Sequence, residues 1–313
     1  MAWTTKDIPE QSGRFAVVTG ANTGLGYETA LELVGAGAEV VVAARNQAKG
    51  ADAVQRILRA HPNAAVRLEL LDLASLADVA AFSARIAGQH QRIDLLINNA
   101  GVMALPKRGE TVDGFEQQFG VNYLGHFALT AKLLPLLRAA PAPRVVNLSS
   151  GVHHAGAIHF DDLEWTRRYS PFAAYSQSKL AMLMFAFELQ RHSDAGGWGL
   201  MSNTAHPGYA RTELIASGPG ADSFSARVGA VLLAPWMSQT AADGALPTLY
   251  AATSPAAVGG GYYGPDGIFE MKGAPKTASI ARQARDRGVA SRLWSVSEQL
   301  TGAVFPPLAA QAA

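Results

Sequence analysis

Short runs of aliphatic and β-branched residues alternate along the chain with longer stretches of helical periodicity. From residue 15 the runs are FAVVT, EVVVAA, AVRLELL, IDLLIN, RVVNLS and GLMSNTA, and the segments between them predict helices at about 24–36, 46–60, 75–89, 113–138 and 172–192. Apolar runs of this kind suit strands covered on both faces, and the alternation predicts a parallel sheet with right-handed crossovers. We therefore expect a Rossmann-type α/β fold: a doubly wound parallel sheet of about seven strands with helices on both faces.

No linker, charge block or change of composition divides the chain. We therefore expect a single domain over residues 1–313, with a cofactor half at about 13–150, a catalytic and substrate half at about 151–305, and a tail to residue 313. After residue 207 the pattern loosens into PGYARTELIASGPGADSF, and the glycine-rich run AVGGGYYGPDG comes later. Long irregular segments of compact domains are commonly functional, so residues 209–245 are predicted to form a substrate lid, followed by a late sheet edge and a C-terminal extension.

Composition narrows the class of protein. Hydrophobic residues make up 49% and charged residues 16% of the chain, and the formal net charge is +1. Basic residues are scattered, so neither a nucleic-acid partner nor an acidic membrane surface is indicated. The absence of cysteine removes disulfides and thiolate chemistry. Because no leader and no apolar run near the roughly 18 residues that span a bilayer is visible, we expect a cytoplasmic protein with a small-molecule partner.

The first predicted strand runs directly into TGANTGLG, which opens a helical pattern. Gly20, Gly24 and Gly26 would permit a tight turn and the close approach of a pyrophosphate, while the helix N-terminus offers N–H groups and a positive dipole. An ordinary strand-to-helix turn is the alternative. The strand before and the amphipathic helix after favour a dinucleotide site, although the spacing G-x-x-x-G-x-G differs from the common G-x-G-x-x-G.

Tyr175 and Lys179 stand four residues apart in AAYSQSKLAMLMF, which places a phenol and an ammonium one turn apart on one helix face. Such a pair alone is usually a solvated face or a packing pair. A tyrosine with a pKa of about 10 needs roughly 4 kcal/mol of help to ionise near neutrality, and a nearby ammonium supplies part of it. This helix is apolar nearly all round, so either a subunit interface of a homo-oligomer or the C-terminal residues should cover its outer side.

Further motifs resemble the short-chain dehydrogenase/reductase family over almost the whole chain. LDLAS, NNAG, GVNYLGHF, NLSS, YSQSK and HPGYART follow TGANTGLG in the order that the family has. NNAGVM, DGFEQQFGVNYLGHFALT, SSGVHHAGAIHF and the long segment between Ser150 and Tyr175 are similar to its retinol-dehydrogenase-like group. The resemblance implies hydride transfer with a nicotinamide cofactor at a site that contains Asn122, Ser150, Tyr175 and Lys179.

The resemblance also implies a role for each of these residues. Tyr175 would be the general acid for reduction and the base for oxidation, with Lys179 lowering its pKa and holding the nicotinamide ribose. Ser150, rather than Ser149, would bond the substrate oxygen, and Asn122 would anchor a water through which Lys179 exchanges protons with solvent. Residues of the other motifs would join Tyr175 and Lys179 in holding the cofactor: Gly20, Asn22, Thr23, Gly24, Leu25, Gly26, Arg45, Asp72, Leu73, Asn99, Ala100, Gly101, Pro207, Gly208 and Thr212.

The end of the second predicted strand bears on which nicotinamide cofactor is used. An acidic residue there would hydrogen-bond the adenosine ribose of NAD, and this chain has none. VVAARN instead places Arg45 about 20 residues beyond the glycine loop, where a guanidinium can pair with the 2′-phosphate of NADP. An arginine that ends the strand and faces solvent is the alternative. The sequence therefore favours NADP(H) over NAD(H).

Histidines at 153, 154 and 159 could suggest a zinc site, because imidazole is a common zinc ligand. They lie in a polar insertion, and a nicotinamide mechanism needs no metal, so we expect solvated loop histidines and no metal. Met103, Phe172 and Tyr209 adjoin the cofactor motifs and are candidates either for an apolar substrate pocket or for plain packing.

Together these features predict an NADP(H)-dependent oxidoreductase that interconverts an apolar ketone or aldehyde and the corresponding alcohol. Two alternatives remain: an NAD-linked alcohol dehydrogenase, and a catalytically silent nucleotide-sensing protein of the same fold. No motif specifies the substrate itself.

Overall fold

The computed structural model of the chain describes residues 2–210 and 238–306. Their eight strands form one sheet in the order β3-β2-β1-β4-β5-β6-β7-β8. The strand bounds are β1 Phe15–Thr19, β2 Glu39–Ala44, β3 Val66–Leu70, β4 Leu95–Asn98, β5 Arg144–Leu148, β6 Met201–Ala205, β7 Tyr262–Pro265 and β8 Pro275–Thr277. The first six coincide with the six apolar runs of the sequence, so the expected doubly wound sheet is confirmed.

The described residues form eight strands, one more than the approximate number of seven expected from the sequence. Strands β1 to β7 pair in parallel, whereas β8 pairs antiparallel with β7, with Gly264 opposite Lys276. β8 contains only three residues, and its sequence PKT has a proline and no apolar side chain that would mark a buried strand. A short polar edge strand of this kind leaves no hydrophobic pattern to predict it from.

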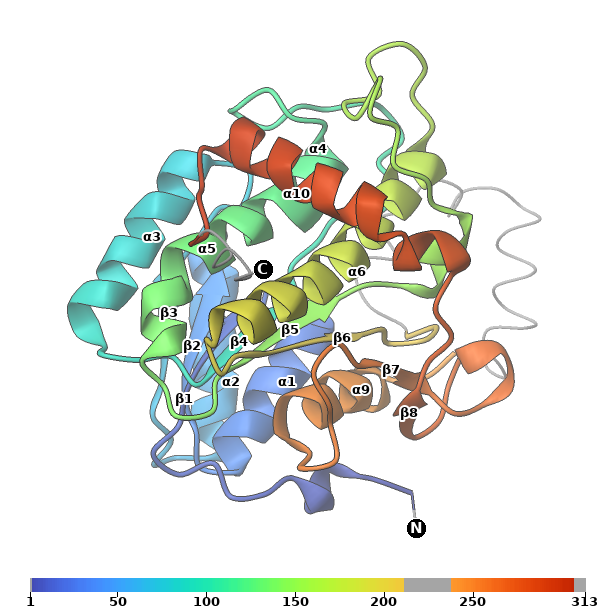
Figure 1. The fold of residues 1–313 in the computed structure, drawn as a ribbon. Helices are drawn as coiled ribbons and strands as arrows, with labels where there is room; N and C mark the ends of the chain where they lie inside the picture. The colour runs from blue at the N-terminus through green and yellow to red at the C-terminus, as the bar shows by residue number, and fades with distance from the viewer. Residues whose placement is uncertain (1, 211–237, 307–313) are drawn as a thin grey trace.

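Helices cover both faces of the sheet. The principal ones are α1 Gly24–Gly35, α2 Gln47–Ala60, α3 Leu76–Gln89, α4 Gln117–Phe119, α5 Gly125–Arg138, α6 Pro171–Gly196, α9 Ala241–Thr253 and α10 Arg287–Thr301. Figure 1 shows α3, α5 and α6 on one side of the sheet and α1 and α9 on the other. Successive residues of a strand point to opposite faces of the sheet. Val17 packs against the layer of α3, α5 and α6, whereas Ala16 and Val18 pack against the layer of α1, α2 and α9.

Short turns complete the described chain. The 3-10 turns are η1 Thr5–Asp7, η3 Gly151–Ala155, η4 Ile268–Glu270 and η5 Arg282–Arg285, and η2 Gly120–Leu124 is a π turn. The helix predicted at 113–138 is therefore divided into α4, η2 and α5. Glu116 begins it, because its carboxylate accepts hydrogen bonds from the backbone N–H groups of Gln118 and Phe119.

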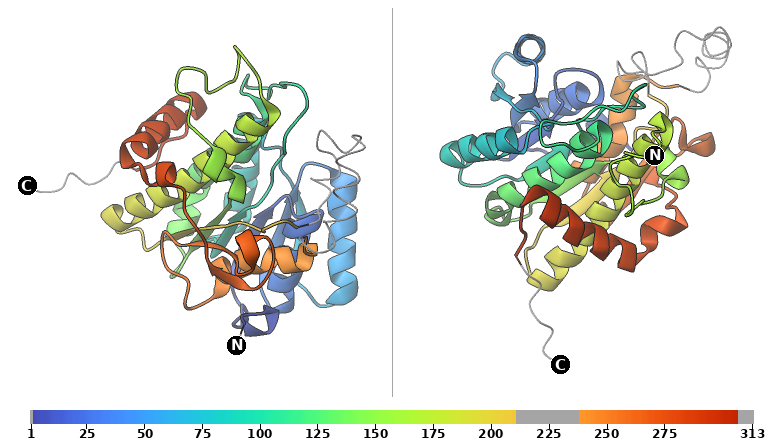
Figure 2. Two further views of the ribbon diagram at one scale, coloured as in Figure 1. Left: turned by 90° about the vertical axis from the view of Figure 1, so that its right-hand side faces the viewer. Right: turned by 90° about the horizontal axis from the view of Figure 1, so that it is seen from above.

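The C-terminal residues cover the outer side of α6. α10 packs across α6, as the two views of Figure 2 show. Trp294 of α10 and the following Phe305 lie with their ring centroids 5.8 and 6.3 Å from that of Phe185 on α6. We expected either a subunit interface or the C-terminal residues to cover the outer side of this apolar helix. The C-terminal residues of the same chain therefore provide one of these two coverings.

Parallel strands bring their carboxyl ends to the same edge of a sheet. Residues that follow β1, β2, β3, β4, β5 and β6 therefore lie along one edge, although they come from six places in the sequence. The strand order reverses between β1 and β4, and such a switch point is where open α/β sheets bind ligands.

Candidate active site

The turn between β1 and α1 has a backbone that side chains would obstruct. Gly20 and Gly24 have φ angles of +65° and +56°, in the left-handed region. Gly26 is buried, and a Cβ added there would lie 2.5 Å from the carbonyl oxygen of Gly20 and against the side-chain amide of Asn99. The N-terminus of α1 follows directly, so its unpaired N–H groups adjoin the turn. The turn thus meets the steric and electrostatic requirements of a pyrophosphate cradle.

We expect Gly26→Ala to weaken dinucleotide binding at least about tenfold and to lower the free energy of unfolding by about 1–3 kcal/mol, because its Cβ must displace the Gly20 backbone. Fluorescence titration with NADPH and urea unfolding measure the two effects. Gly88→Ala is the matched control, since Gly88 lies on α3 with no atom within 4 Å of an added Cβ. Equal cofactor affinity in the two variants would contradict the cradle.

The loop after β4 packs against the glycine turn and is hydrogen-bonded to the end of β1. The hydroxyl of Thr19 accepts hydrogen bonds from the backbone N–H groups of Asn99 and Ala100, at 2.9 and 3.0 Å. The amide of Asn99 donates in return to the carbonyl oxygen of Thr19, at 2.7 Å. The predicted cofactor residues Asn99 and Ala100 therefore lie against Gly20, from which an added Cβ would reach Ala100. Sequence reasoning missed Thr19, whose position at the end of β1 was its only signal.

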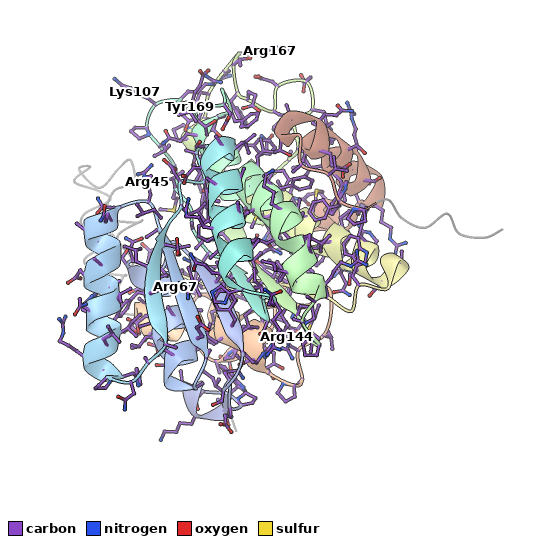
Figure 3. All side chains as sticks on the ribbon, turned by 90° about the vertical axis from the view of Figure 1, so that its left-hand side faces the viewer. Arg45, Arg67, Lys107, Arg144, Arg167 and Tyr169 are labelled. Carbon is purple, nitrogen blue, oxygen red and sulfur yellow. The ribbon has the colours of Figure 1, made fainter. Side chains whose placement is uncertain are left out.

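Arg45 and Asp72 lie on the other side of the glycine turn from the catalytic residues. Arg45 follows β2 and is exposed, and Asp72 follows the neighbouring β3 and accepts a hydrogen bond from the N–H of Ala74 at 2.9 Å. Figure 3 shows Arg45 at the same end of the sheet as Tyr169, whereas Arg144, the first residue of β5, lies at the opposite end. The β2–β3 edge thus presents an exposed guanidinium at the carboxyl ends of these strands.

A second guanidinium near the glycine turn was not foreseen. Arg56 of α2 donates to the carbonyl oxygen of Asn22 at 3.1 Å and lies 4.1 Å from the ring centroid of Tyr27. It also pairs with Asp52 at 3.0 Å. Arg56 was missed because only the packing of α2 against α1 brings it to the turn.

Helix α6 carries Tyr175 and Lys179 into the interior, where they are 6% and 5% exposed. The side chain of Ser150, which begins η3 after β5, lies close enough to the Tyr175 hydroxyl to lower its pKa. The Nζ of Lys179 lies 5.8 Å from the centroid of the Tyr175 ring and donates to the carbonyl oxygen of Leu148 at 2.9 Å. The end of β5 therefore positions both the serine hydroxyl and the lysine ammonium around the phenol.

The pKa of Tyr175 differs from the expectation that Lys179 would lower it. Burial raises the pKa of Tyr175 to about 12, and the nearby side chain of Ser150 opposes this rise. Burial also lowers the pKa of Lys179 to about 8, because a charged ammonium is poorly solvated there. In the protein alone the phenol is therefore neutral at physiological pH, because desolvation outweighs the opposing influence of Ser150.

Asn122 lies in the π turn between α4 and α5. Its side-chain amide donates to the carbonyl oxygen of Val102 and to the hydroxyl of Ser178, both at 2.9 Å, and its oxygen accepts from the N–H of Val102 at 2.8 Å. A Cβ added at Gly101 would lie 3.1 Å from this oxygen and 3.6 Å from the Nζ of Lys179. Asn122 thus joins the loop after β4 to α6 beside Lys179. Its role toward a water stays a prediction.

Ser149 and Ser150 occupy different environments. The hydroxyl of Ser149 is 3% exposed and donates to the carbonyl oxygen of Lys179 at 2.8 Å. Ser150 is partly exposed, its hydroxyl lies near that of Tyr175, and it accepts a hydrogen bond from the N–H of Val152 at 3.4 Å. Ser149 thus bonds β5 to α6, whereas Ser150 is partly open to the site. The choice of Ser150 as the residue that bonds the substrate stays a prediction.

The turn after β6 lies close to the glycine turn between β1 and α1. Gly208 has a φ of +60°, and its N–H donates to a ring nitrogen of His206 at 3.2 Å. Gly244 of α9 allows close packing, since a Cβ added there would lie 2.9 Å from a methyl carbon of Leu25 and 3.5 Å from the Cβ of Pro207. Three predicted cofactor residues, Leu25, Pro207 and Gly208, are thereby brought together. Thr212 and most of the predicted lid lie outside the described residues.

The three histidines of the insertion do not share one environment. His154 and His159 are exposed, as expected, whereas His153 is fully buried, so the expectation of a solvated histidine is wrong for this residue. Both ring nitrogens of His153 have protein partners. Within residues 2–210 and 238–306, no three histidine or acidic side chains gather as metal ligands would.

A glycine turn at the switch point of a doubly wound sheet, with a partly exposed Ser and a buried Tyr and Lys beside it, defines an oxidoreductase of the dinucleotide-binding class. The family model for short chain dehydrogenases matches residues 14–219. The chain belongs to the short chain dehydrogenase family.

Relatives extend the match over most of the chain. It is 43% identical to human retinol dehydrogenase 13 (Homo sapiens), with 96% of this chain and 88% of that protein covered. It is 40% identical to the polyprenol dehydrogenase of Mus musculus, with 95% and 86% covered. These relatives place it nearest the retinol-dehydrogenase-like group and support an oxidoreductase acting on CH–OH groups.

Solved structures agree with the fold. A protein of unknown function from Mycobacterium paratuberculosis has a TM-score of 0.81 at 41% identity, covering 98% of this chain and all (100%) of that one. A short chain dehydrogenase from Escherichia coli CFT073, complexed with NADPH, has a TM-score of 0.61 at 25% identity, covering 78% and 92%. The sheet and its helices are therefore those of known family members.

The comparisons contradict the cytoplasmic location expected from the sequence. The relatives are named for retinol and polyprenol, which are water-insoluble isoprenoid alcohols, whereas the expectation rested on the lack of a leader and of a long apolar run. In the described part of the chain no helix combines the length and the apolar character needed to cross a membrane.

Proposed function

We propose that this protein is an NADP(H)-dependent oxidoreductase that interconverts an apolar aldehyde or ketone and its alcohol, with Tyr175 as the general acid and base. The observation that carries the proposal is the contact of the Tyr175 hydroxyl with Ser150 beside the buried ammonium of Lys179. A bound NADPH would supply the hydride for reduction of the carbonyl carbon.

The residues present fit a dinucleotide. The glycine turn leaves space that a Cβ would fill, and the N-terminus of α1 favours an anion. Asn99, Ala100 and Gly101 would lie beneath the nicotinamide half, and Pro207 and Gly208 beside it. On the adenosine side, the remaining predicted contacts are Arg45, Asp72 and Leu73.

Tyr175 has the properties that a proton donor needs. Its pKa of about 12 keeps the phenol protonated at neutral pH, so it can transfer a proton to the oxygen of a carbonyl as negative charge develops there. Ser150 would bond the same oxygen and polarise it. Lys179, whose pKa of about 8 lies close to physiological pH, can return a proton toward the phenol. Asn122 would keep this ammonium in contact with solvent through a water.

An apolar substrate is supported by two observations. Phe172 lies one turn before Tyr175 on α6 and is 54% exposed, and Tyr209 follows the turn after β6 and is 37% exposed. Large apolar side chains left open beside a reactive group are typical of a substrate surface. The named substrates of the relatives, retinol and polyprenol, are isoprenoid alcohols. We infer an isoprenoid or similarly apolar alcohol as the substrate class.

The test is the oxidation of NADPH, followed by absorbance, with a panel of aliphatic, aromatic and isoprenoid aldehydes and ketones. We expect turnover that is faster with NADPH than with NADH and that increases with apolar chain length. Better turnover with NADH would identify the NAD-linked alternative. Tight NADPH binding without turnover of any carbonyl or alcohol would identify the silent nucleotide-sensing alternative.

We expect Arg45→Ser to lower kcat/KM for NADPH by about 10- to 100-fold and to leave kcat/KM for NADH nearly unchanged. The reason is that a guanidinium bonded to a phosphate contributes about 1.5–3 kcal/mol, and only NADPH carries the 2′-phosphate. Steady-state kinetics with both cofactors measure the ratio. Arg59→Ser serves as the control, because Arg59 is an exposed arginine in the last turn of α2. An unchanged ratio for Arg45→Ser would refute its role.

A further inference from the structure

His153 joins the active-site serine to a distant part of the chain. It follows Ser150 by three residues in η3, it is 0% exposed, and its Nδ1 lies 2.7 Å from the carbonyl oxygen of Ser150. Its other nitrogen, Nε2, lies 3.2 Å from the backbone nitrogen of Ala281, which is 128 residues away in sequence. The imidazole ring thus bridges the backbone of Ser150 and the segment that follows β8.

The two hydrogen-bond partners of the His153 ring allow only one protonation state and tautomer. A carbonyl oxygen can only accept, so Nδ1 must carry the proton that bonds Ser150, and a backbone N–H can only donate, so Nε2 must accept from Ala281. The ring is therefore a neutral imidazole with one defined tautomer. Burial agrees, since it lowers the pKa of His153 to about 4, with nearby His154 and His206 acting in the same direction and Glu270 opposing it.

A second side chain, that of Gln283, also hydrogen-bonds the segment around Ala281 to η3. The side-chain amide of Gln283 in η5 donates to the carbonyl oxygens of His153, His154 and Gly156, at 3.3, 2.9 and 3.1 Å. Gly156 in turn lies against α6, where an added Cβ would approach the carbonyl oxygen of Ser176 to 2.6 Å. Residues 278–285 therefore hold η3 between themselves and the helix that carries Tyr175.

We propose that His153 is a positioning residue, which holds the backbone of Ser150 so that its hydroxyl meets Tyr175 and the substrate oxygen. The segment 278–285 then belongs to the active site, although none of the four predicted catalytic residues lies in it. This inference rests on the proposed function, because it assigns a purpose to the placement of Ser150. An aromatic ring without nitrogens would fill the same volume and remove both ring hydrogen bonds, so that the Ser150 carbonyl keeps the backbone N–H of His153 and Ala281 loses the ring nitrogen.

The experiment compares three variants in carbonyl reduction with NADPH. We expect His153→Phe to lower kcat by about 10- to 100-fold, since small displacements of a catalytic group are costly, while the NADPH dissociation constant stays within about threefold. His153→Asn should recover most of kcat, because its amide nitrogen lies near the position of Nδ1 and can donate to Ser150. His154→Phe, at the exposed neighbour that bonds Ser279, should stay within about twofold.

Hydrogen exchange of the peptide that contains Ala281 provides a readout independent of turnover, and it should accelerate in His153→Phe more than in His154→Phe. An active wild-type protein whose His153→Phe variant keeps kcat within twofold would overturn the positioning role alone. A kcat that falls equally in His153→Phe and His153→Asn would also overturn it, since the bond to Ser150 would then not matter. A wild-type protein that binds NADPH but reduces no carbonyl would overturn the proposed function and this role together.

Discussion

Replacement of Tyr175 by Phe is expected to lower kcat for carbonyl reduction by at least about 10³-fold, because it removes the hydroxyl that is proposed to protonate the substrate oxygen. The ring remains in its buried position, and only the hydroxyl beside Ser150 is lost. The NADPH dissociation constant should change by no more than about threefold. Single-turnover reduction with saturating NADPH measures the chemical step, and fluorescence titration measures the binding.

Tyr250→Phe is the matched control for this prediction. Tyr250 lies on α9, and its ring packs edge-on against Trp3 at 5.4 Å on the opposite side of the sheet from α6. Its kcat should equal that of the wild type. A Tyr175→Phe protein that reduces carbonyls at the wild-type rate would show that another group supplies the proton. A protein that no longer binds NADPH would point to a misfolded site and would call for comparison with Ser150→Ala.

Much of the framework was predictable because it rests on local patterns. The first six strands are buried on both faces, so continuous apolar runs mark them, and the glycines of the β1–α1 turn are required by backbone conformation and close approach. Because parallel strands share one carboxyl edge, the strand order alone brings Ser150 and Asn99 to the same edge of the sheet. The local pairing of Tyr175 and Lys179 on one helix was likewise visible from their spacing.

Other features depend on contacts between distant parts of the chain and left no pattern. The position of Arg56 over Asn22 follows from how α2 packs, and the burial of His153 follows from Ala281 and Gln283, about 130 residues later. The pKa of Tyr175 is the clearest case. Its spacing from Lys179 predicted a lowered pKa, but desolvation by surrounding elements decides the direction. Sequence spacing indicates which groups meet, whereas burial determines their charge.

The second large effect concerns Lys179, whose replacement by Met should remove most activity and yet stabilise the fold at neutral pH. Under the proposed function the ammonium returns the proton to Tyr175 and holds the nicotinamide ribose, so kcat/KM should fall by about 10²-fold or more without it. The stability gain arises because burial lowers the pKa of Lys179 from 10.5 to about 8. Holding the charged form inside the folded protein therefore costs free energy at pH 7.

The sign follows from proton linkage. Between pH 8 and 10.5 the unfolded chain binds the lysine proton and the folded protein does not, so the stability of the wild type rises with pH over this interval. Below pH 8 the full cost of about 3 kcal/mol applies, and above pH 10.5 it disappears. Lys179→Met also loses the hydrogen bond from Nζ to the Leu148 carbonyl oxygen, which reduces the gain in stability by about 1 kcal/mol or more. Lys179→Met should thus be more stable than wild type by about 1–2 kcal/mol at pH 7.

Urea unfolding at pH 7 and pH 10 tests this linkage directly. The stability difference between Lys179→Met and wild type should be about 2 kcal/mol smaller at pH 10 than at pH 7, because the wild-type lysine is then neutral in the folded protein. Lys132→Met, at an exposed position on α5, should show a difference that does not change with pH. A destabilised Lys179→Met protein with the same deficit at both pH values would mean that the ammonium is fully solvated or paired. The ammonium would then carry no cost in the folded protein, and activity and stability would not be in conflict at this position.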